Sequence, residues 1–268
     1  MYKTVYLQKL IFKITILQTA ERVSDKDLSD NFVYQRSVLA YFEASKLVSG
    51  NVLEIGFGEG YGMRVLSPKV ANYTAIDKHY KDFKDLPSNV KIINQQVPPL
   101  SMFADETFDF VVSFQVIEHI KNDKFFVKEI SRVLKKGGKF IVTTPNIKMS
   151  LTRNPWHIRE YKLDELKNLL SKDFSEIDCK GVLGNEKVSA YYLENKKSVQ
   201  RIMRFDIFRM QYWLPRWILQ IPYDIMNRRN RKKLLTQNTS LVADIKMDDY
   251  FVDSATDNCF DWFFEAKK

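Results

Sequence analysis

A glycine-rich turn that follows an apolar run is the part of the sequence best suited to bind a ligand. It reads Val52-Leu53-Glu54-Ile55-Gly56-Phe57-Gly58-Glu59-Gly60. Glycine adopts a positive φ without steric penalty, and glycines at alternate positions place no Cβ between the main-chain N–H groups and a bound molecule. A helix after such a turn adds unsatisfied N–H donors and the positive end of its dipole. The turn therefore suits a carboxylate or a phosphate.

An acid ends the next predicted strand. The short run Tyr73-Thr74-Ala75-Ile76 stops at Asp77, and a doubly wound fold places a carboxylate at such a position against ribose hydroxyls. A role in a turn or as a helix cap is the alternative for Asp77. The nicotinamide dinucleotide fingerprint requires a further glycine where this chain has Tyr61, so an NAD-dependent oxidoreductase is the weakest interpretation.

Two histidines follow strands that are predicted farther along the chain. His119 comes after the apolar run 108–114, and His157 lies in the loop after a later strand. An imidazole exchanges a proton near neutral pH, so His119 is the candidate general base and His157 is expected to share its pocket. The alternative is that His119 only packs or forms hydrogen bonds at the start of a helix. The third histidine, His79, is predicted to be a loop residue on the ligand side.

Alternating helical and strand patterns predict the framework that positions these residues. Helices are expected at about 28–48, 61–66, 126–134 and 164–170. Strands are expected at 52–55, 73–76, 91–94, 108–114, 140–146, 174–183 and 260–266. Lys135-Lys136-Gly137-Gly138 is typical of a basic last helical turn followed by a glycine stop. Strands that alternate with helices indicate an α/β fold with a mostly parallel sheet.

Several motifs occur in the order found in one enzyme family. They are the acid-x-Gly-x-Gly-x-Gly turn, F-D-x-V-x-S with V-I-E-H-I, and L-K-K-G-G with T-T-P-N. Over about residues 30–184 the chain resembles the type 11 and type 23 families of class I S-adenosylmethionine-dependent methyltransferases. The resemblance implies a Rossmann-like, doubly wound sheet of seven strands, mostly parallel, whose last strand runs antiparallel beside the fifth.

The resemblance also implies the cofactor and the residues around it. S-adenosylmethionine would be the cofactor and methyl transfer the reaction. The implied cofactor-binding residues are Glu54, Gly56, Gly58, Gly60, Asp77, Gln96, Val97 and Ser113. The glycine turn would wrap the methionine end, Asp77 would bind the ribose, and the loop with Gln96, where the family usually has an acid, would hold the adenine. His119 and His157 would be catalytic, because methyl transfer mainly requires an aligned acceptor and removal of its proton.

A metal-binding role is the alternative for four of the polar residues. Gln115, Glu118, His119 and His157 together resemble the metal-binding set of small-RNA 2′-O-methyltransferases. Those enzymes have a glutamate where this chain has Gln115. Because this difference removes one anionic ligand, we expect no metal ion, and we interpret Glu118 as a first-turn acid favoured by the helix dipole.

Composition limits the chain to one domain with an insertion. Its 268 residues, 45% of them hydrophobic, can bury one substantial core. The predicted division is an N-terminal extension at 1–27, a methyltransferase core at 28–184, a helical insertion at 185–258 and the last core strand at 259–268. No apolar stretch is long enough to span a membrane, and Lys3, Lys9 and Lys13 interrupt the apolar start, so we expect neither a spanning helix nor a signal peptide. Cys179 and Cys259 are expected to be buried thiols in a reducing cytoplasm.

One part of the insertion, residues 196–233, carries a charge equal to that of the whole chain. Residues 196–233 contain 11 lysines or arginines and two aspartates, and their net charge of +9 matches that of the full sequence. Aromatic residues interleave with the arginines, and Pro215 and Pro222 are expected to divide the segment into short helices. The preferred interpretation is a lid over a small-molecule or lipid-like acceptor, with peripheral contact to anionic membrane or to nucleic acid as alternatives. An RNA acceptor, and a non-catalytic nucleotide-binding module that docks on a membrane or partner, also stay open.

Overall fold

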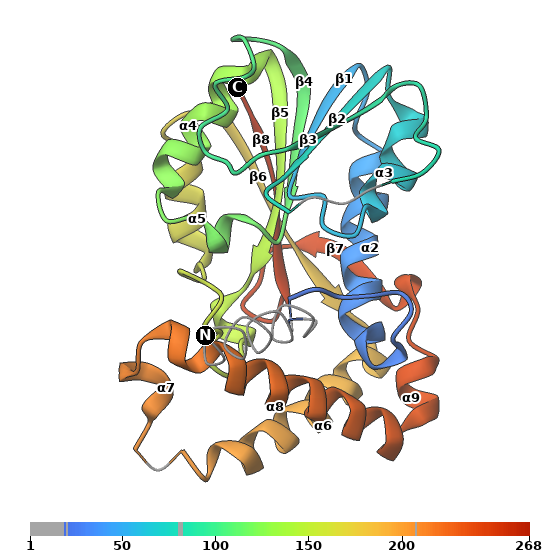
Figure 1. Cartoon of the computed structure of the whole chain (residues 1–268), viewed down its shortest axis with the longest axis vertical. Helices are drawn as coiled ribbons and strands as arrows, with labels where there is room; N and C mark the ends of the chain where they lie inside the picture. Colours follow the sequence, from blue (N-terminus) through green and yellow to red (C-terminus); the bar gives the residue numbers. More distant parts are fainter. Residues whose placement is uncertain (1–18, 20, 80–82, 207) are drawn as a thin grey trace, which may run out of the picture.

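A computed structural model describes residues 19, 21–79, 83–206 and 208–268 (Figure 1). Most of the predicted N-terminal extension, including the apolar and basic segment 1–17, lies outside the described residues. We call the described residues that precede the first long helix, 19 and 21–30, the strap. The strap leads directly into α2 (Asn31–Ser45).

An eight-stranded sheet forms the centre of the molecule, with the strand order β3-β2-β1-β4-β5-β8-β6-β7. The strands are β1 (Asn51–Ile55), β2 (Asn72–Asp77), β3 (Val90–Asn94), β4 (Phe108–Phe114), β5 (Leu134–Pro145), β6 (Glu176–Gly184), β7 (Tyr250–Ser254) and β8 (Asp261–Lys267). β1 to β5 pair in parallel, whereas β8 runs antiparallel to its neighbours β5 and β6. The predicted Rossmann-like, doubly wound sheet with an antiparallel last strand beside the fifth is therefore confirmed.

The predicted number of seven strands is wrong by one. β7 lies inside the segment that we expected to be helical, and it pairs antiparallel with β6 at the edge of the sheet. Tyr250, Phe251 and Val252 are aromatic and β-branched residues that favour a strand. Tyr250 is buried and its hydroxyl donates a hydrogen bond to the Phe32 carbonyl, so tertiary contacts hold this strand in place.

Helices cover both faces of the sheet (Figure 1). α2 and α3 (Tyr61–Leu66) lie on one face, and α4 (Asp123–Val133) and α5 (Leu163–Leu170) lie on the other. Successive residues of a strand point to opposite faces. Val112 of β4 accordingly joins the apolar cluster of α2 and α3, whereas Val111 joins the cluster of α4 and α5.

The predicted glycine stop after α4 is part of a strand instead. α4 ends at Val133 and β5 begins immediately, so Lys135 and Gly138 belong to β5. The pairing of β4 with β5 shifts register here, and Gly137 adopts a φ of +76°. The basic residues and glycines therefore form an irregularity in the sheet, because the register shift needs a residue that tolerates a left-handed backbone.

The insertion packs against the core through its apolar side chains, and its role as a lid stays a prediction. It contains α6 (Glu186–Met203), α7 (Met210–Trp213), α8 (Arg216–Gln237), α9 (Thr239–Ala243) and β7. Its buried apolar side chains belong to the cluster of α2: Val188, Tyr191, Leu234, Val242, Ile245 and Tyr250. Figure 1 shows α6 and α8 crossing the end of the sheet at which the parallel strands finish.

α8 continues through a proline that was expected to end a helix. Pro215 does precede its first residue, but Pro222 lies inside its 22 residues. Proline removes one main-chain hydrogen bond from a helix. The buried Asp224, Asn230 and Leu234 attach α8 to the rest of the molecule beyond that point. None of the helices in the described part of the chain has both the length and the apolar content required to cross a membrane.

Candidate active site

The residues predicted for the site lie at the carboxyl edge of the sheet, where doubly wound folds bind their ligands. The glycine turn follows β1, Asp77 ends β2, and Gln96 and Val97 follow β3. His157 lies in the loop after β5. His119 lies in a 3₁₀ turn (Ile117–His119) after β4, where we expected the start of an α-helix.

The glycine turn has the left-handed backbone that its residues permit. The φ angle is +83° at Gly56, +51° at Gly58 and +84° at Gly60. A Cβ on Gly56 would lie 2.3 Å from Cγ2 of Val116, so packing alone requires this glycine. A Cβ on Gly58 would meet nothing within 4 Å. The turn is therefore open at Gly58, and a ligand can approach the main chain there.

Asp77 connects the turns that follow β1 and β2. Its Oδ2 accepts a hydrogen bond from the main-chain N–H of Gly58 at 3.0 Å, and its Oδ1 accepts one from the N–H of His79 at 2.8 Å. The two bonds fix the carboxylate beside the open part of the glycine turn. The structure thus brings Asp77 and Gly58 together, and the ribose contact of Asp77 stays a prediction.

Glu54 lies beneath the glycine turn. Its side chain is buried, and its carboxylate accepts hydrogen bonds from the Tyr41 hydroxyl at 2.7 Å and from the Tyr73 hydroxyl. Burial raises the pKa of Glu54 to about 7, although both hydrogen bonds oppose the shift. A Cβ on Gly62 would clash with Tyr41 and with Glu54, so α3 packs tightly over this carboxyl. Glu54 supports the turn from below, and its contact with a cofactor stays a prediction.

The other predicted cofactor residues have different environments. Gln96 is exposed, and Val97 packs against the apolar cluster of α4 and α5. Ser113 is completely buried in β4, and no hydrogen-bond partner of its hydroxyl is found among the described residues. The roles of these three residues also stay predictions.

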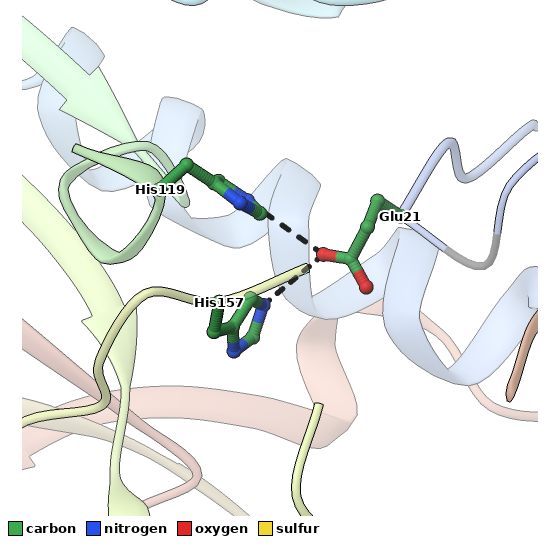
Figure 2. A group of neighbouring side chains, drawn as sticks. All are labelled: Glu21, His119 and His157. Atoms are coloured by element: carbon green, nitrogen blue, oxygen red, sulfur yellow. Dashed lines mark hydrogen bonds and ion pairs between the residues drawn. The ribbon is translucent and has the colours of Figure 1, made fainter. Parts of the chain in front are cut away.

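His119 and His157 face one carboxylate (Figure 2). Their ring centroids are 5.0 Å apart. Oε2 of Glu21, a residue of the strap, lies 3.1 Å from Nε2 of His157 and 3.7 Å from Nε2 of His119. The structure therefore brings the two predicted catalytic histidines together and adds an acid between them.

Each imidazole is oriented through its other nitrogen. Nδ1 of His119 lies 3.0 Å from the Trp156 carbonyl oxygen, and Nδ1 of His157 lies 2.7 Å from Oε1 of Glu160. A carbonyl and an ionised carboxylate can only accept a hydrogen bond. Both Nδ1 atoms therefore carry a proton, and both Nε2 atoms are directed toward Glu21.

The two histidines differ in charge. Burial lowers the pKa of His119, so its ring is neutral at neutral pH. Burial acts in the same direction on His157, but its hydrogen bonds to the carboxylates of Glu160 and Glu21 outweigh burial and raise the pKa of His157 to about 10. His157 in turn lowers the pKa of Glu21 to about 2, against the opposing effect of burial. The site thus combines one neutral imidazole with one charged imidazole.

Glu118, predicted as a first-turn acid, is a completely buried residue of the 3₁₀ turn. Its Oε2 accepts a hydrogen bond from the Thr144 hydroxyl at 3.0 Å, and its main-chain carbonyl accepts one from the N–H of Ile158 at 2.7 Å. Burial raises the pKa of Glu118 to about 8. The residue connects the turn that carries His119 to the loop that carries His157.

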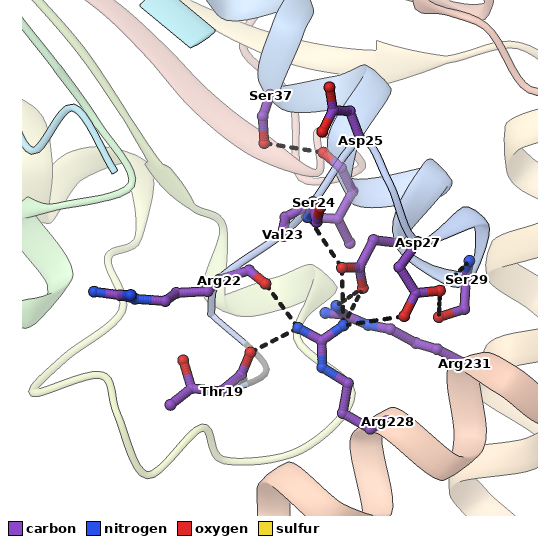
Figure 3. Close-up of polar contacts among 12 residues, drawn as sticks. Thr19, Arg22, Val23, Ser24, Asp25, Asp27, Ser29, Ser37, Arg228 and Arg231 are labelled. Atoms are coloured by element: carbon purple, nitrogen blue, oxygen red, sulfur yellow. Dashed lines mark hydrogen bonds and ion pairs between the residues drawn. The ribbon is translucent and has the colours of Figure 1, made fainter. Parts of the chain in front are cut away.

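The strap is held by α8 (Figure 3). Arg228 donates to the Asp30 carboxylate at 2.7 and 2.8 Å, and to the main-chain carbonyls of Thr19 and Arg22 at 2.7 Å each. Thr19 and Arg22 lie on either side of Glu21 in the sequence. Arg228 therefore fixes the short segment that presents Glu21 to the histidines.

α8 also holds the loop that carries His157. The Asp224 carboxylate accepts a hydrogen bond from Nε1 of Trp156 at 3.0 Å, and Arg216 donates to the main-chain carbonyl of Ile158 at 3.0 Å. Trp156 and Ile158 are the immediate neighbours of His157. One helix of the insertion thus supports both sides of the histidine pair.

Sequence reasoning missed three residues of this site, namely Glu21, Asn154 and Glu160. Glu160 lies three residues after His157 in the same loop, and this proximity in the sequence was a usable signal. Asn154 donates from Nδ2 to Oε1 of Glu21 at 2.8 Å. Glu21 is distant from both histidines in the sequence, so only the tertiary structure reveals its proximity.

Known proteins resemble this chain in sequence and in fold. Residues 53–142 match a family model described as a methyltransferase domain. A probable S-adenosylmethionine-dependent methyltransferase of Mycobacterium tuberculosis is 35% identical over 162 residues, which cover 57% of this chain and 58% of that protein. A ubiquinone biosynthesis O-methyltransferase of Rickettsia conorii is 24% identical over 151 residues, which cover 54% of this chain and 52% of that protein. A solved structure from Thermotoga maritima, a SAM-dependent methyltransferase described as a possible histamine N-methyltransferase, has a TM-score of 0.52 at 17% identity and covers 88% of this chain and 92% of its own.

The fold, the glycine turn and these similarities define a class of protein. Residues 53–142 match the methyltransferase-domain family, and 162 residues of the chain are similar to a probable S-adenosylmethionine-dependent methyltransferase. S-adenosylmethionine is the cofactor of that family, as the resemblance in the sequence implied. At 17% identity the solved structure shows the fold alone. The chain spans 58% of the length of the Mycobacterium tuberculosis relative.

Proposed function

We propose that this chain transfers a methyl group from S-adenosylmethionine to an amphiphilic acceptor at an anionic membrane surface. One observation carries the proposal. An open glycine turn, fixed beside Asp77, lies at the same edge of the sheet as His119, a neutral imidazole whose Nε2 is directed away from its main-chain partner. This edge would hold the cofactor and the acceptor together. The expected location is the cytoplasm, in peripheral contact with the membrane.

The proposed reaction is an in-line displacement at the methyl carbon. The bond from that carbon to sulfur breaks as its bond to an acceptor oxygen forms, and S-adenosylhomocysteine leaves. The protein must align the acceptor and remove its proton. Nε2 of His119 is suited to take this proton, because burial keeps the ring neutral and the Trp156 carbonyl keeps the other proton on Nδ1. His157, held by Glu21 and Glu160, would position the acceptor.

The exposed apolar side chains of the insertion fit an amphiphilic acceptor. Ten large apolar side chains between residues 205 and 226 are exposed, and we call them the apolar surface: Phe205, Phe208, Met210, Tyr212, Trp213, Trp217, Ile218, Ile221, Ile225 and Met226. Trp217, Ile221 and Ile225 recur every four residues and therefore share one face of α8. Contiguous exposed apolar residues of this kind mark contact with a membrane or a protein.

The surrounding charges favour an anionic membrane. Arg201, Arg204 and Arg209 are exposed in the same segment, and a segment that exposes both arginines and large apolar residues suits anionic lipid. Nucleic acid is less favoured, because Arg228 and Arg231 are only 13% and 14% exposed and pair with the buried Asp30. The similarity to an O-methyltransferase supports an oxygen as the methylated atom.

Vesicle co-sedimentation followed by a transfer assay tests this proposal. The chain should bind vesicles that contain phosphatidylglycerol better than neutral phosphatidylcholine vesicles, and salt should weaken the binding. Replacing Trp213 and Trp217 by alanine should reduce binding, whereas Phe125→Ala, at an exposed aromatic residue on α4, should not. Radiolabelled S-adenosylmethionine should then label a lipid extract. Labelling of RNA in place of lipid, without vesicle binding, would contradict the proposed acceptor.

A further inference from the structure

The cluster of Glu21, His119 and His157 has the composition of a metal site (Figure 2). The three residues come from the strap, from the turn after β4 and from the loop after β5. One ligand atom from each lies within 4.8 Å of the other two. Two imidazoles and one carboxylate form a set that binds divalent first-row metals and leaves coordination positions open.

The orientation of both imidazoles also fits a metal site. The Nδ1–H groups of His119 and His157 point to a carbonyl oxygen and to a carboxylate, respectively. Histidines that bind a metal usually donate their second nitrogen to such an acceptor, which fixes the tautomer and makes the ligand nitrogen more basic. The two Nε2 atoms are the ones directed to the shared position beside Glu21.

The distances are close to those that an ion requires. With bonds of about 2.0–2.1 Å, the ligand atoms of a tetrahedral site lie about 3.4 Å apart. Oε2 of Glu21 lies 3.1 Å from Nε2 of His157 and 3.7 Å from Nε2 of His119. Small side-chain movements would therefore complete the geometry.

Glu21 is itself held by neighbouring groups. Asn154 donates from Nδ2 to Oε1 of Glu21 at 2.8 Å, and its Oδ1 accepts the N–H of Trp156 at 3.0 Å, which fixes the orientation of the amide. Oε2 of Glu21 is thereby left to the histidines. Arg228 holds the main chain on both sides of Glu21 (Figure 3). The carboxylate thus belongs to an organised site with a second layer of supporting residues.

We infer that Glu21, His119 and His157 bind one divalent transition-metal ion of the zinc, cobalt or iron(II) kind. From the sequence we expected no metal ion, because Gln115 stands where an anionic ligand is needed. In the folded chain Glu21 supplies that anionic ligand. The inference goes beyond the proposed function and does not depend on methyl transfer. With the ion bound, Nε2 of His119 would be a ligand and could not take the acceptor proton as proposed above. The ion would instead make an acceptor oxygen bound at an open coordination position more acidic, so that its proton could pass to solvent.

A cobalt titration of the whole chain, without a polyhistidine tag and after removal of metal with EDTA, tests the inference. We expect saturable binding of one Co²⁺ per chain with a visible d–d absorption band, and displacement by Zn²⁺. Glu21→Gln, His119→Ala and His157→Ala should each weaken binding about 10- to 100-fold or more, since even supporting residues have effects of that size. His79→Ala changes the third histidine, which is exposed and outside the cluster, and should leave binding unchanged.

A second measurement, the unfolding temperature with and without Co²⁺, tests the inference even for a variant that folds less stably. Binding to the native state raises the unfolding temperature, so Co²⁺ should stabilise the wild-type chain and the His79→Ala chain more than Glu21→Gln. Absence of saturable binding, or equal binding by Glu21→Gln and wild type, would overturn the inference. The titration contains no S-adenosylmethionine. Failure to bind S-adenosylhomocysteine would therefore count against the proposed function and leave the metal site untouched.

Discussion

The main-chain N–H of Gly58 donates a hydrogen bond to Oδ2 of Asp77 at 3.0 Å, and this bond joins the turns after β1 and β2. Gly58 contributes only main chain, and Asp77 contributes a charge. We therefore expect the two residues to affect a bound cofactor in different ways. Substitutions at the two positions therefore distinguish the effect of the site's shape on ligand binding from the effect of its charge.

Asp77→Ala should weaken the binding of S-adenosylhomocysteine by about 2–4 kcal/mol. Two hydrogen bonds from ribose hydroxyls to a carboxylate are charge-assisted, and each such bond contributes about 1.5–3 kcal/mol with incomplete additivity. Calorimetric titration measures the change. Asp253→Ala, on the edge strand β7, is the control and should bind like wild type. A loss of less than about threefold, below 1 kcal/mol, would assign Asp77 a purely structural role.

Gly58→Val should abolish binding of S-adenosylhomocysteine while the protein stays folded. The valine would place a β-branched side chain at a φ of +51° in the open part of the turn. Gly137→Val is a matched control, because Gly137 also has a positive φ and open space around its Cβ but lies at the start of β5. Both variants should lose about 1–2 kcal/mol of stability. Equal affinity of the two variants for the ligand would show that the glycine turn is only structural.

The sequence allowed most of the central sheet to be predicted, because its signals are local. The apolar run 108–114 matches β4, and the helix expected at 61–66 matches α3. β7 was missed because its neighbours along the chain are helical and its partner, β6, is far away in the sequence. Pro222 gave a misleading local signal, since buried side chains later in α8 outweigh one lost hydrogen bond.

The candidate site could be predicted only in part. His119 and His157 were identified because each follows a predicted strand, and parallel strands bring such positions to one edge. Glu21 has no such pattern around it. Its position depends on Arg228, a residue of the insertion that is distant from Glu21 in the sequence. Long-range ion pairs of this kind cannot be read from local spacing.

Arg228→Met should reduce the free energy of unfolding by about 3 kcal/mol. Removing one partner of a buried ion pair leaves the other charge poorly compensated, which typically costs about 3–5 kcal/mol. Here Arg231 still donates to Asp30 at 2.7 Å and reduces the loss. Denaturant unfolding gives the value, and Arg229→Met, at an exposed position of α8, should change it little. Equal stability of both variants would mean that α8 does not hold the strap in solution.

Glu54 should make the stability of the cofactor-free chain depend on pH. Its pKa is raised by burial from 4.5 to about 7, so the folded state binds more protons than the unfolded state between these values. The stabilising contribution of the protonated carboxyl is complete below pH 4.5 and is lost as the pH rises through about 7. The free energy of unfolding of wild type relative to Glu54→Gln should therefore fall by about 2–3 kcal/mol between pH 5 and about 7.5.

Unfolding curves at several pH values measure this difference. Glu194→Gln, at a partly exposed position on α6, is the control and should show almost no pH-dependent difference from wild type. A constant difference between wild type and Glu54→Gln across the range would contradict the prediction. It would mean that Glu54 is ionised within the folded core throughout.

Calorimetric titration of the wild-type chain with S-adenosylhomocysteine, and separately with NADH, tests the central claim most directly. The open turn at Gly58 and the carboxylate of Asp77 suit the amino-acid and ribose groups of the first ligand, and the chain lacks the third glycine of the dinucleotide fingerprint. We predict saturable binding of one S-adenosylhomocysteine per chain and no binding of NADH. Binding of NADH without binding of S-adenosylhomocysteine would contradict the account.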